Sequence, residues 1–236
     1  MKAMILAAGQ GTRLRPHTNK RPKPMIPIGG KPILEHTVER LSQFGIQEIA
    51  INLHYHPEVI QNHFGDGAKW NVSIRYSYEE SLLGTAGALK TISDFFDDTF
   101  ILWYGDNLCY LNLPQLINFH KTKGGIGAIV LHWREDVSQS GIVDLDNDCR
   151  ILRFLEKPSP EQIFSHWVNA GVFVLEPEVL NYIPENQSYD FGHDLFPKLL
   201  ESDRALYGYC MHENERMWWI DRTEDLQTVI RYWERG

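Results

Sequence analysis

Stretches patterned as β-strands alternate with stretches patterned as helices along all 236 residues of the chain. Apolar runs at 2–8, 46–53 and 99–104 are typical of buried strands, whereas 31–45 and 223–236 carry apolar residues at helical spacing. Such alternation predicts βαβ units, and therefore an α/β fold with a mainly parallel, mixed sheet and helices on both faces. No linker interrupts the pattern, so we expect a single domain with ligands at the carboxyl ends of the strands.

The balance of charge argues against one class of partner. The chain has 31 Asp and Glu against 23 Lys and Arg, a formal net charge of −8, whereas a nucleic-acid-binding protein needs a basic surface.

No apolar run approaches the ~20 residues that span a bilayer, and the run at 3–8 is shorter than the core of a signal peptide. The three cysteines form no CxxC pair, so neither a zinc site nor a disulfide framework is indicated, and we expect a cytoplasmic protein.

The opening stretch departs from this acidic average. No Asp or Glu occurs in residues 1–34, although several Arg and Lys residues do. The first predicted strand leads into the small residues Ala7, Ala8, Gly9 and Gly11. Backbone N–H groups in such a loop can approach an anion closely because no large side chain intervenes. The stretch is therefore predicted to bind phosphate.

The glycines of this loop match neither of two common phosphate-binding motifs. Both the P-loop and the dinucleotide-binding fingerprint need a glycine where Leu14 stands. Instead, Arg13 offers a planar fork for phosphate oxygens, and Lys23, which lies between two prolines, offers a point charge. A solvated basic loop is the alternative. The lack of acids favours a polyphosphate site, since carboxylates would repel that ligand.

The run from Met4 to His36 resembles, nearly residue for residue, the N-terminal signature of the sugar-1-phosphate nucleotidyltransferases, or nucleoside-diphosphate-sugar pyrophosphorylases. Weaker matches continue to the C-terminal helix, and the chain is most similar to short mannose-1-phosphate guanylyltransferase-like forms. The resemblance implies a Rossmann-like fold, a nucleoside triphosphate, a sugar 1-phosphate and Mg²⁺. Within one domain over 1–236, it assigns the nucleotide to the N-terminal half and the sugar phosphate to the C-terminal half. The left-handed β-helix domain of longer relatives is not expected.

A second loop of small residues, "LLGTAGAL" at 82–89, is expected to enter a helix with Thr85 as a candidate N-cap. Gly84 and Gly87 leave room for a flat ring, and Glu79 and Glu80 just before them can accept hydrogen bonds from a base. A tight helix start without a ligand is the alternative. The resemblance places the nucleobase here and favours guanine. The nucleotide-binding residues that we predict are Leu6, Ala7, Ala8, Gly9, Gly11, Thr12, Arg13, Lys23, Glu80, Gly84, Thr85 and Asp106.

Two aspartates are predicted to hold the metal ion. Asp106 follows an apolar strand and a glycine, and Asp221 precedes the last predicted helix. A carboxylate after a strand is well placed for Mg²⁺, and the resemblance makes both residues metal ligands, with Arg13, Lys23 and Asp106 as the catalytic residues. The residue after the second aspartate, Arg222, departs from the family pattern.

The C-terminal half carries the residues that the resemblance assigns to the sugar phosphate. Glu156 can accept hydrogen bonds from sugar hydroxyls, Lys157 can meet the phosphate, and Asn169 can do both. The backbone of Gly141 is expected to face the sugar. Taken alone, each of the three side chains can equally be an ordinary surface or turn residue.

The expected activity joins a nucleoside triphosphate to a sugar 1-phosphate, giving a nucleoside-diphosphate sugar and pyrophosphate. GTP and mannose 1-phosphate are the favoured pair. Two alternatives remain open. One is a uridylyl-, thymidylyl- or cytidylyltransferase of the same fold that acts on glucose 1-phosphate, N-acetylmuramate 1-phosphate or phosphocholine. The other is a catalytically silent relative that binds a nucleotide sugar and regulates a partner. The oligomeric state is left open.

Overall fold

A computed structural model describes residues 1–234, which divide into two compact units. Unit 1 comprises Met1–Leu82, Trp103–Tyr110 and the segment that begins at Arg216, and unit 2 comprises Leu83–Leu102 and Leu111–Glu215. The strand β6 (Phe100–Tyr104) contributes its first three residues to unit 2 and its last two to unit 1. Each unit is described by itself below.

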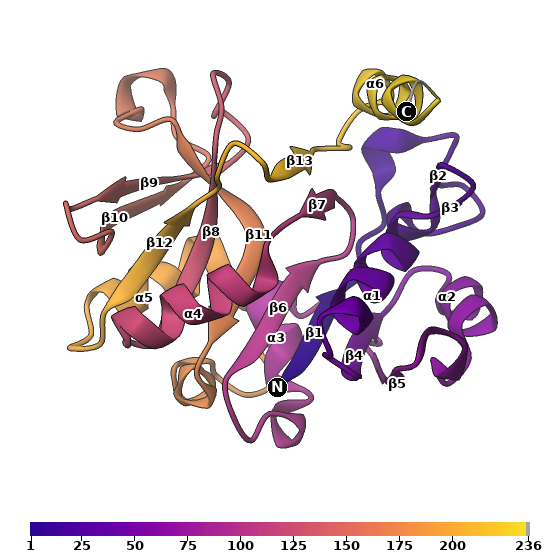
Figure 1. The fold of residues 1–236 in the computed structure, drawn as a ribbon, viewed down its shortest axis with the longest axis horizontal. Helices are drawn as coiled ribbons and strands as arrows, with labels where there is room; N and C mark the ends of the chain where they lie inside the picture. Colours follow the sequence, from indigo (N-terminus) through magenta and orange to yellow (C-terminus); the bar gives the residue numbers. More distant parts are fainter. Residues whose placement is uncertain (235–236) are drawn as a thin grey trace. The chain divides into compact units, whose positions relative to one another are not determined.

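Unit 1 is built on three parallel strands (Figure 1). They are β1 (Lys2–Leu6), β4 (Glu48–Leu53) and β5 (Ser73–Tyr78), and the helices α1 (Ile33–Gln43) and α2 (Pro57–Phe64) lie in the connections between them. β4 is the middle strand, with Ile51 beside Ile5 on one side and beside Tyr76 on the other. Every residue of β4 after the first is buried, as is typical of a parallel strand covered on both faces.

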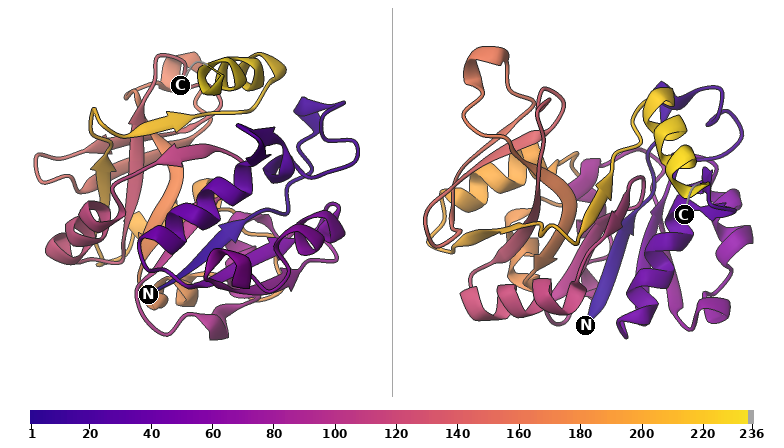
Figure 2. Two further views of the ribbon diagram at one scale, coloured as in Figure 1. Left: turned by 45° about the vertical axis from the view of Figure 1, so that its right-hand side comes forward. Right: turned by 45° about the horizontal axis from the view of Figure 1, so that its top comes forward.

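The C-terminal segment completes unit 1. The short strands β7 (Leu108–Tyr110) and β13 (Arg216–Trp218) pair antiparallel, as do β2 (Pro27–Ile28) and β3 (Lys31–Pro32). Figure 2 shows α6 (Thr223–Trp233) beside the N-terminal segment that carries β2 and β3. The apolar cluster beneath α6 is formed by Leu14, Ile26, Ile28, Ile33, Leu108, Ile220, Leu226 and Val229. Gly29 has a φ of 58°, and a Cβ atom there would overlap the indole ring of Trp233, so no side chain fits at this position.

Unit 2 has a mixed sheet. Its strands are β8 (Gly127–Trp133), β9 (Gly141–Leu145), β10 (Ile151–Glu156), β11 (Trp167–Leu175) and β12 (Leu206–Cys210). β11 pairs antiparallel with β8 and β9, β9 pairs antiparallel with β10, and β12 pairs parallel with β8. Its helices are α3 (Gly84–Lys90), α4 (Leu113–Lys123) and α5 (Phe196–Leu200), and α4 packs on β11 and β12 whereas α5 packs on β10.

The α/β class and the mixed sheet with helices are confirmed, and several elements begin where the sequence predicts. The helix at Pro57 is one example. Thr85 as an N-cap is wrong, because α3 begins at Gly84 and the hydroxyl of Thr85 lies inside its first turn. The short strands β2, β3 and β7 were not expected, whereas β13 overlaps the strand-like run predicted at 217–220. The last two residues of the helix expected over 223–236 lie outside the described residues.

Unit 1 includes segments from both the N-terminal and the C-terminal half of the sequence. Within residues 1–234, no helix combines the length and the apolar character that crossing a membrane requires.

Candidate active site

The small-residue loop after β1 is anchored by a buried side chain of β4. The N–H of Ala7 donates to Oδ1 of Asn52 at 2.7 Å, and Nδ2 of Asn52 donates to Oε1 of Glu79 at 2.6 Å. Asn52 is 4% exposed and Glu79 is 3% exposed. The carboxylate of Glu79 therefore points into unit 1 and does not stand ready for a base, contrary to our expectation from the sequence. Glu80 is exposed.

Gly11 allows this loop to fold back tightly. Its φ is 59°, and a Cβ atom there would lie 2.9 Å from Cβ of Lys23. The buried hydroxyl of Thr18 donates to the carbonyl oxygen of Gly11 at 2.9 Å. A 3₁₀ turn, Thr12–Leu14, follows and leaves the side chain of Arg13 exposed. The loop thus places an exposed guanidinium and an exposed Gly9 on the same short arc of chain.

Lys23 is the buried charge of the candidate site. Its side chain is 7% exposed, and its Nζ donates to Oδ2 of Asp106 at 2.8 Å and to Oδ1 of Asp221 at 3.0 Å. Burial alone would lower the pKa of Lys23, but the charges and hydrogen bonds of the two carboxylates outweigh it and raise the pKa above its ordinary value. The ammonium is therefore charged at neutral pH. The structure brings Lys23, Asp106 and Asp221 together at one point of unit 1.

Backbone contacts explain how two aspartates so far apart in the sequence meet. The N–H of Gly105, just before Asp106, donates to the carbonyl oxygen of Leu6 at 2.9 Å. The buried side chain of Asn107 accepts the N–H of Ile220 at 3.2 Å through Oδ1. Asp106 lies just before β7 and Asp221 lies just after β13. Because Leu108 pairs with Trp218, the two aspartates flank the same end of this antiparallel pair. Neither Asn52 nor Asn107 was singled out from the sequence.

The loop around Arg222 is ordered by a cap. Oδ2 of Asp225 accepts the N–H of Asp221 at 3.1 Å and that of Arg222 at 2.8 Å, at the start of α6. The unusual residue after the second aspartate therefore leaves a capped helix start in place.

The two carboxylates suit a magnesium ion. Among residues 1–234, no group of three or more His, Cys, Asp or Glu side chains could hold a metal ion. Magnesium, however, is typically bound by one or two carboxylates together with substrate phosphates and water. Asp106 and Asp221 already converge on one cationic group, and their side chains are 37% and 35% exposed. The donor set fits the ion that the sequence predicts.

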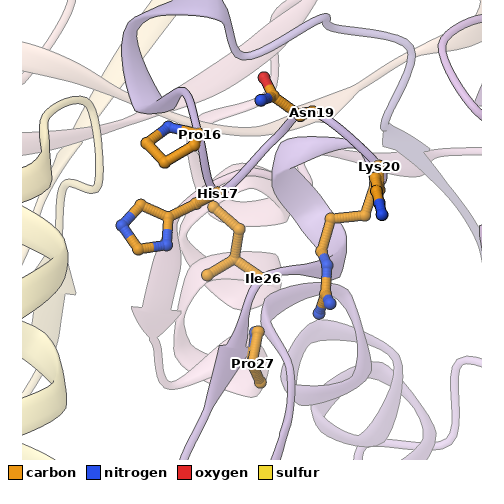
Figure 3. Close-up of a pocket in the computed structure, with 7 residues that line it drawn as sticks. Pro16, His17, Asn19, Lys20, Ile26 and Pro27 are labelled. Carbon is orange, nitrogen blue, oxygen red and sulfur yellow. The ribbon is translucent and has the colours of Figure 1, made fainter.

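A cavity of about 400 Å³ lies on the acid-free stretch (Figure 3). It is lined by Pro16, His17, Asn19, Lys20, Arg21, Ile26 and Pro27. Three of these side chains can carry positive charge, and none is acidic. The sequence indicated the basic character of this stretch but not a cavity.

In unit 2, the structure brings two of the predicted sugar-phosphate residues into contact. Gly141 of β9 pairs with Glu156 of β10, and a Cβ atom on Gly141 would lie 2.7 Å from Oε2 of that glutamate. Burial raises the pKa of Glu156. The side chain of Asn169, on the neighbouring β11, accepts the N–H of Gly171 at 2.8 Å. Lys157 is exposed, with a φ of 46°.

The glycines of the loop at 82–89 are covered by the chain itself. A Cβ atom on Gly84 would lie 2.5 Å from the carbonyl oxygen of Tyr189, and one on Gly87 would lie 2.8 Å from that of Gln187. Backbone of residues 187–189 therefore lies against the side of the loop on which a Cβ atom of either glycine would project. The hydroxyl of Thr85 donates to Asp190 at 2.7 Å. Asp190 was not singled out from the sequence, although an aspartate just before a helical segment is a common cap.

A family model described as "Nucleotidyl transferase" matches residues 2–234, and the chain belongs to this family. Three curated relatives are a UTP–glucose-1-phosphate uridylyltransferase from Synechocystis and mannose-1-phosphate guanylyl- and guanyltransferases from Mycobacterium tuberculosis and Saccharomyces cerevisiae. They are 42%, 36% and 34% identical to the chain over 99%, 88% and 94% of its length. The chain spans 62%, 58% and 61% of these relatives, about three-fifths of each.

Two solved structures resemble the fold closely. HddC from Yersinia pseudotuberculosis, solved with GMP-PN, is 26% identical with a TM-score of 0.80, and the match covers 98% of each chain. A putative glucose-1-phosphate thymidylyltransferase from Bacillus anthracis has a TM-score of 0.89 at 23% identity, over 100% of this chain and 96% of that one. The second likeness supports the fold alone.

Proposed function

We propose that this chain catalyses the transfer of a nucleotidyl group from a nucleoside triphosphate to a sugar 1-phosphate, with release of pyrophosphate. The observation that carries the proposal is the ammonium of Lys23, which is buried between Asp106 and Asp221 beside an acid-free loop of small residues. A buried cation, two carboxylates and an exposed Arg13 form the charge pattern that a polyphosphate with a divalent ion requires.

The reaction needs positioning and charge neutralisation more than proton transfer. A phosphate oxygen of the sugar 1-phosphate attacks the α-phosphorus, the bond from that phosphorus to the bridging oxygen breaks, and the electron pair leaves with pyrophosphate. The attacking oxygen is already anionic near neutral pH, so no side chain must remove a proton. The barrier is the repulsion between two polyanions, which fixed positive charges lower. In unit 1, the exposed Arg13 supplies such a charge, whereas the ammonium of Lys23 offsets the two carboxylates that it contacts.

Asp106 and Asp221 would hold the divalent ion. Mg²⁺ bound there would withdraw charge from the phosphate oxygens of the nucleotide. The role of Lys23 follows from its place: it keeps the two carboxylates close together and neutralises part of their charge. We assign the sugar 1-phosphate to residues of unit 2, where Glu156 accepts hydrogen bonds from hydroxyls and the exposed Lys157 meets the phosphate.

Two substrate pairs have specific support. The loop "GTAGAL" and the two mannose-1-phosphate relatives favour GTP with mannose 1-phosphate. The relative from Synechocystis, which is 42% identical, favours UTP with glucose 1-phosphate. The presence of Arg13, Lys23, Asp106 and Asp221 supports an active enzyme over a silent relative. The three free cysteines support the prediction of a cytoplasmic protein.

The test is a matrix of ATP, GTP, UTP, CTP and dTTP against a panel of sugar 1-phosphates and phosphocholine, with Mg²⁺ and with EDTA, scored by pyrophosphate release. We expect one nucleotide and one sugar phosphate to dominate, and activity to disappear in EDTA. Asp106→Asn is the matched control because it keeps the size of the side chain while removing its charge. Failure of every pair would refute the proposed activity, whereas equal turnover by Asp106→Asn would refute the role of that carboxylate in holding the divalent ion. A preference for CTP or dTTP would replace both substrate pairs.

A further inference from the structure

Asp190 joins two parts of unit 2 through one carboxylate. It precedes a single π-helical turn, Phe191–Leu195. Its Oδ1 accepts the N–H of Gly192 at 2.9 Å and that of His193 at 3.3 Å. Its Oδ2 accepts the hydroxyl of Thr85 at 2.7 Å. The carboxylate thus connects this turn to the loop at 82–89, where the nucleobase is predicted to bind.

Thr85 strengthens the same connection. Its hydroxyl oxygen accepts the N–H of Phe191 at 2.9 Å, and the N–H of Gly87 donates to the carbonyl oxygen of Tyr189, also at 2.9 Å. The first N–H groups of a helical segment have no acceptor within it. Asp190 and Thr85 together supply acceptors for the first three N–H groups of this turn.

The turn faces the carboxylate of Glu156. Gly192 lies against Oε2 of Glu156 so closely that a Cβ atom there would overlap that oxygen. On the other side, a Cβ atom on Gly141 would lie 2.7 Å from the same oxygen. The carboxylate of Glu156 therefore sits in a slot between two glycines, one on β9 and one on the π-helical turn.

The position of Gly192 depends on the cap. π-helical turns are rare in proteins, and those that occur are often found at functional sites. Here the turn is held at its start by the carboxylate of Asp190, while the N–H of Asp190 itself donates to Oδ2 of Asp194 at 2.7 Å. Loss of the Asp190 carboxylate would leave the N–H groups of Gly192 and His193 without their acceptor, and Gly192 would no longer be fixed against Glu156.

We propose that Asp190 is a positioning residue for the sugar-phosphate site, which with Thr85 fixes the turn at 191–195 so that Gly192 and Gly141 hold the Glu156 carboxylate in one orientation. The inference rests on the proposed function, because the binding of the sugar by Glu156 is itself part of that proposal. Asp190 acts through Glu156 and does not itself touch the substrate.

The experiment compares Asp190→Ala, Asp190→Asn, Thr85→Val and the double variant of Asp190→Ala with Thr85→Val. For Asp190→Ala, we expect KM for the sugar 1-phosphate to rise by about tenfold or more while kcat changes by less than about threefold, the pattern of lost substrate binding. Asp190→Asn keeps an oxygen for the N–H groups of Gly192 and His193, so it should restore most of the affinity. The double variant should resemble Asp190→Ala, because the two side chains act through one contact.

Asp146→Ala is the matched control. Oδ1 of Asp146 also accepts two backbone N–H groups, those of Asp148 at 2.8 Å and Arg150 at 2.9 Å, in the turn between β9 and β10. That turn lies at the opposite end of the hairpin from Gly141 and Glu156. Asp146→Ala should therefore lose comparable stability but keep the wild-type KM.

Amide hydrogen exchange at 191–193 provides a readout that needs no activity, and it should accelerate by about tenfold or more in Asp190→Ala. If the wild-type protein turns over no substrate pair, the proposed function fails, and unchanged exchange would separately overturn the positioning role. A KM for Asp190→Ala within twofold of wild type, or an equal rise in Asp146→Ala, would also overturn it. Should Asp190→Ala not fold, Thr85→Val must raise the same KM by about threefold or more, and a wild-type value for that variant would overturn the inference.

Discussion

Replacing Lys23 by Met removes the charge that joins Asp106 and Asp221 but keeps a side chain of similar length in the buried space. The ammonium lies 2.8 Å and 3.0 Å from the two carboxylate oxygens, and the lysine side chain is 7% exposed. Removing one partner of a fully buried ion pair costs about 3–5 kcal/mol. The aspartates are 37% and 35% exposed, so water screens part of the repulsion that remains. We therefore expect Lys23→Met to lower the free energy of unfolding by about 2 kcal/mol.

For a chain of this size, that loss corresponds to a fall in Tm of about 4–8 °C. Thermal unfolding followed by circular dichroism in EDTA measures this fall in Tm. High salt should reduce the difference in Tm between Lys23→Met and wild type, because it screens the repulsion between the two aspartates. Millimolar Mg²⁺ should restore part of the Tm of Lys23→Met, because the ion takes the place of the ammonium between the carboxylates. Lys20→Met, at an exposed position of the same stretch, is the control and should stay within about 1 °C of wild type. A Tm for Lys23→Met at or above wild type in EDTA would refute the reasoning.

Three further outcomes are expected. Arg13→Ala should lower turnover by on the order of 10²-fold, as the loss of a preorganised charge does, with an unchanged Tm because the side chain is exposed; wild-type pyrophosphate release would contradict the phosphate role. Asn107→Ala should lower the free energy of unfolding by about 1–3 kcal/mol in urea titrations, because it leaves the N–H of Ile220 without its acceptor. Burial raises the pKa of Glu156 above its ordinary value of 4.5, so the folded state loses stability as pH rises from that value through the folded pKa. Glu156→Gln should remove this pH dependence and match or exceed wild-type stability at pH 7; thermal scans from pH 4 to pH 8 that show the reverse order at pH 7 would contradict it.

The features predicted correctly from the sequence are those that depend on the local conformational preference of a residue or on a local apolar pattern. Pro57 begins α2, since its fixed φ suits the first turn of a helix. Gly45, with a φ of 77°, follows the end of α1, as a helix C-terminus favours. The apolar run at 2–8 contains β1, whose three middle residues are buried, because a run of apolar residues is itself a signal of burial. Such signals need no knowledge of the rest of the chain.

The contacts that complete the candidate site depend instead on distant segments. Lys23 was assigned to phosphate from its local surroundings, but the carboxylates that hold it follow 83 and 198 positions later in the chain. The strands β7 and β13 have three residues each, too few to show a period. The roles of Asn52 and Asp190 arise from hydrogen bonds to loops far along the chain. No residue pattern near either position contains that information.

The discontinuity of unit 1 has a consequence for the order in which the protein can be made. A ribosome synthesises residues 111–215 before it reaches Asp221 and α6. Until then, the apolar side chains of Ile28 and Leu108 lack the partners that α6 brings, and Lys23 lacks one of its two carboxylates. A nascent chain that stalls before residue 216 therefore exposes apolar surface and is prone to aggregate. We expect such a chain also to lack the proposed activity, because the segment that begins at residue 216 supplies both apolar cover for the core and the second carboxylate of the proposed site.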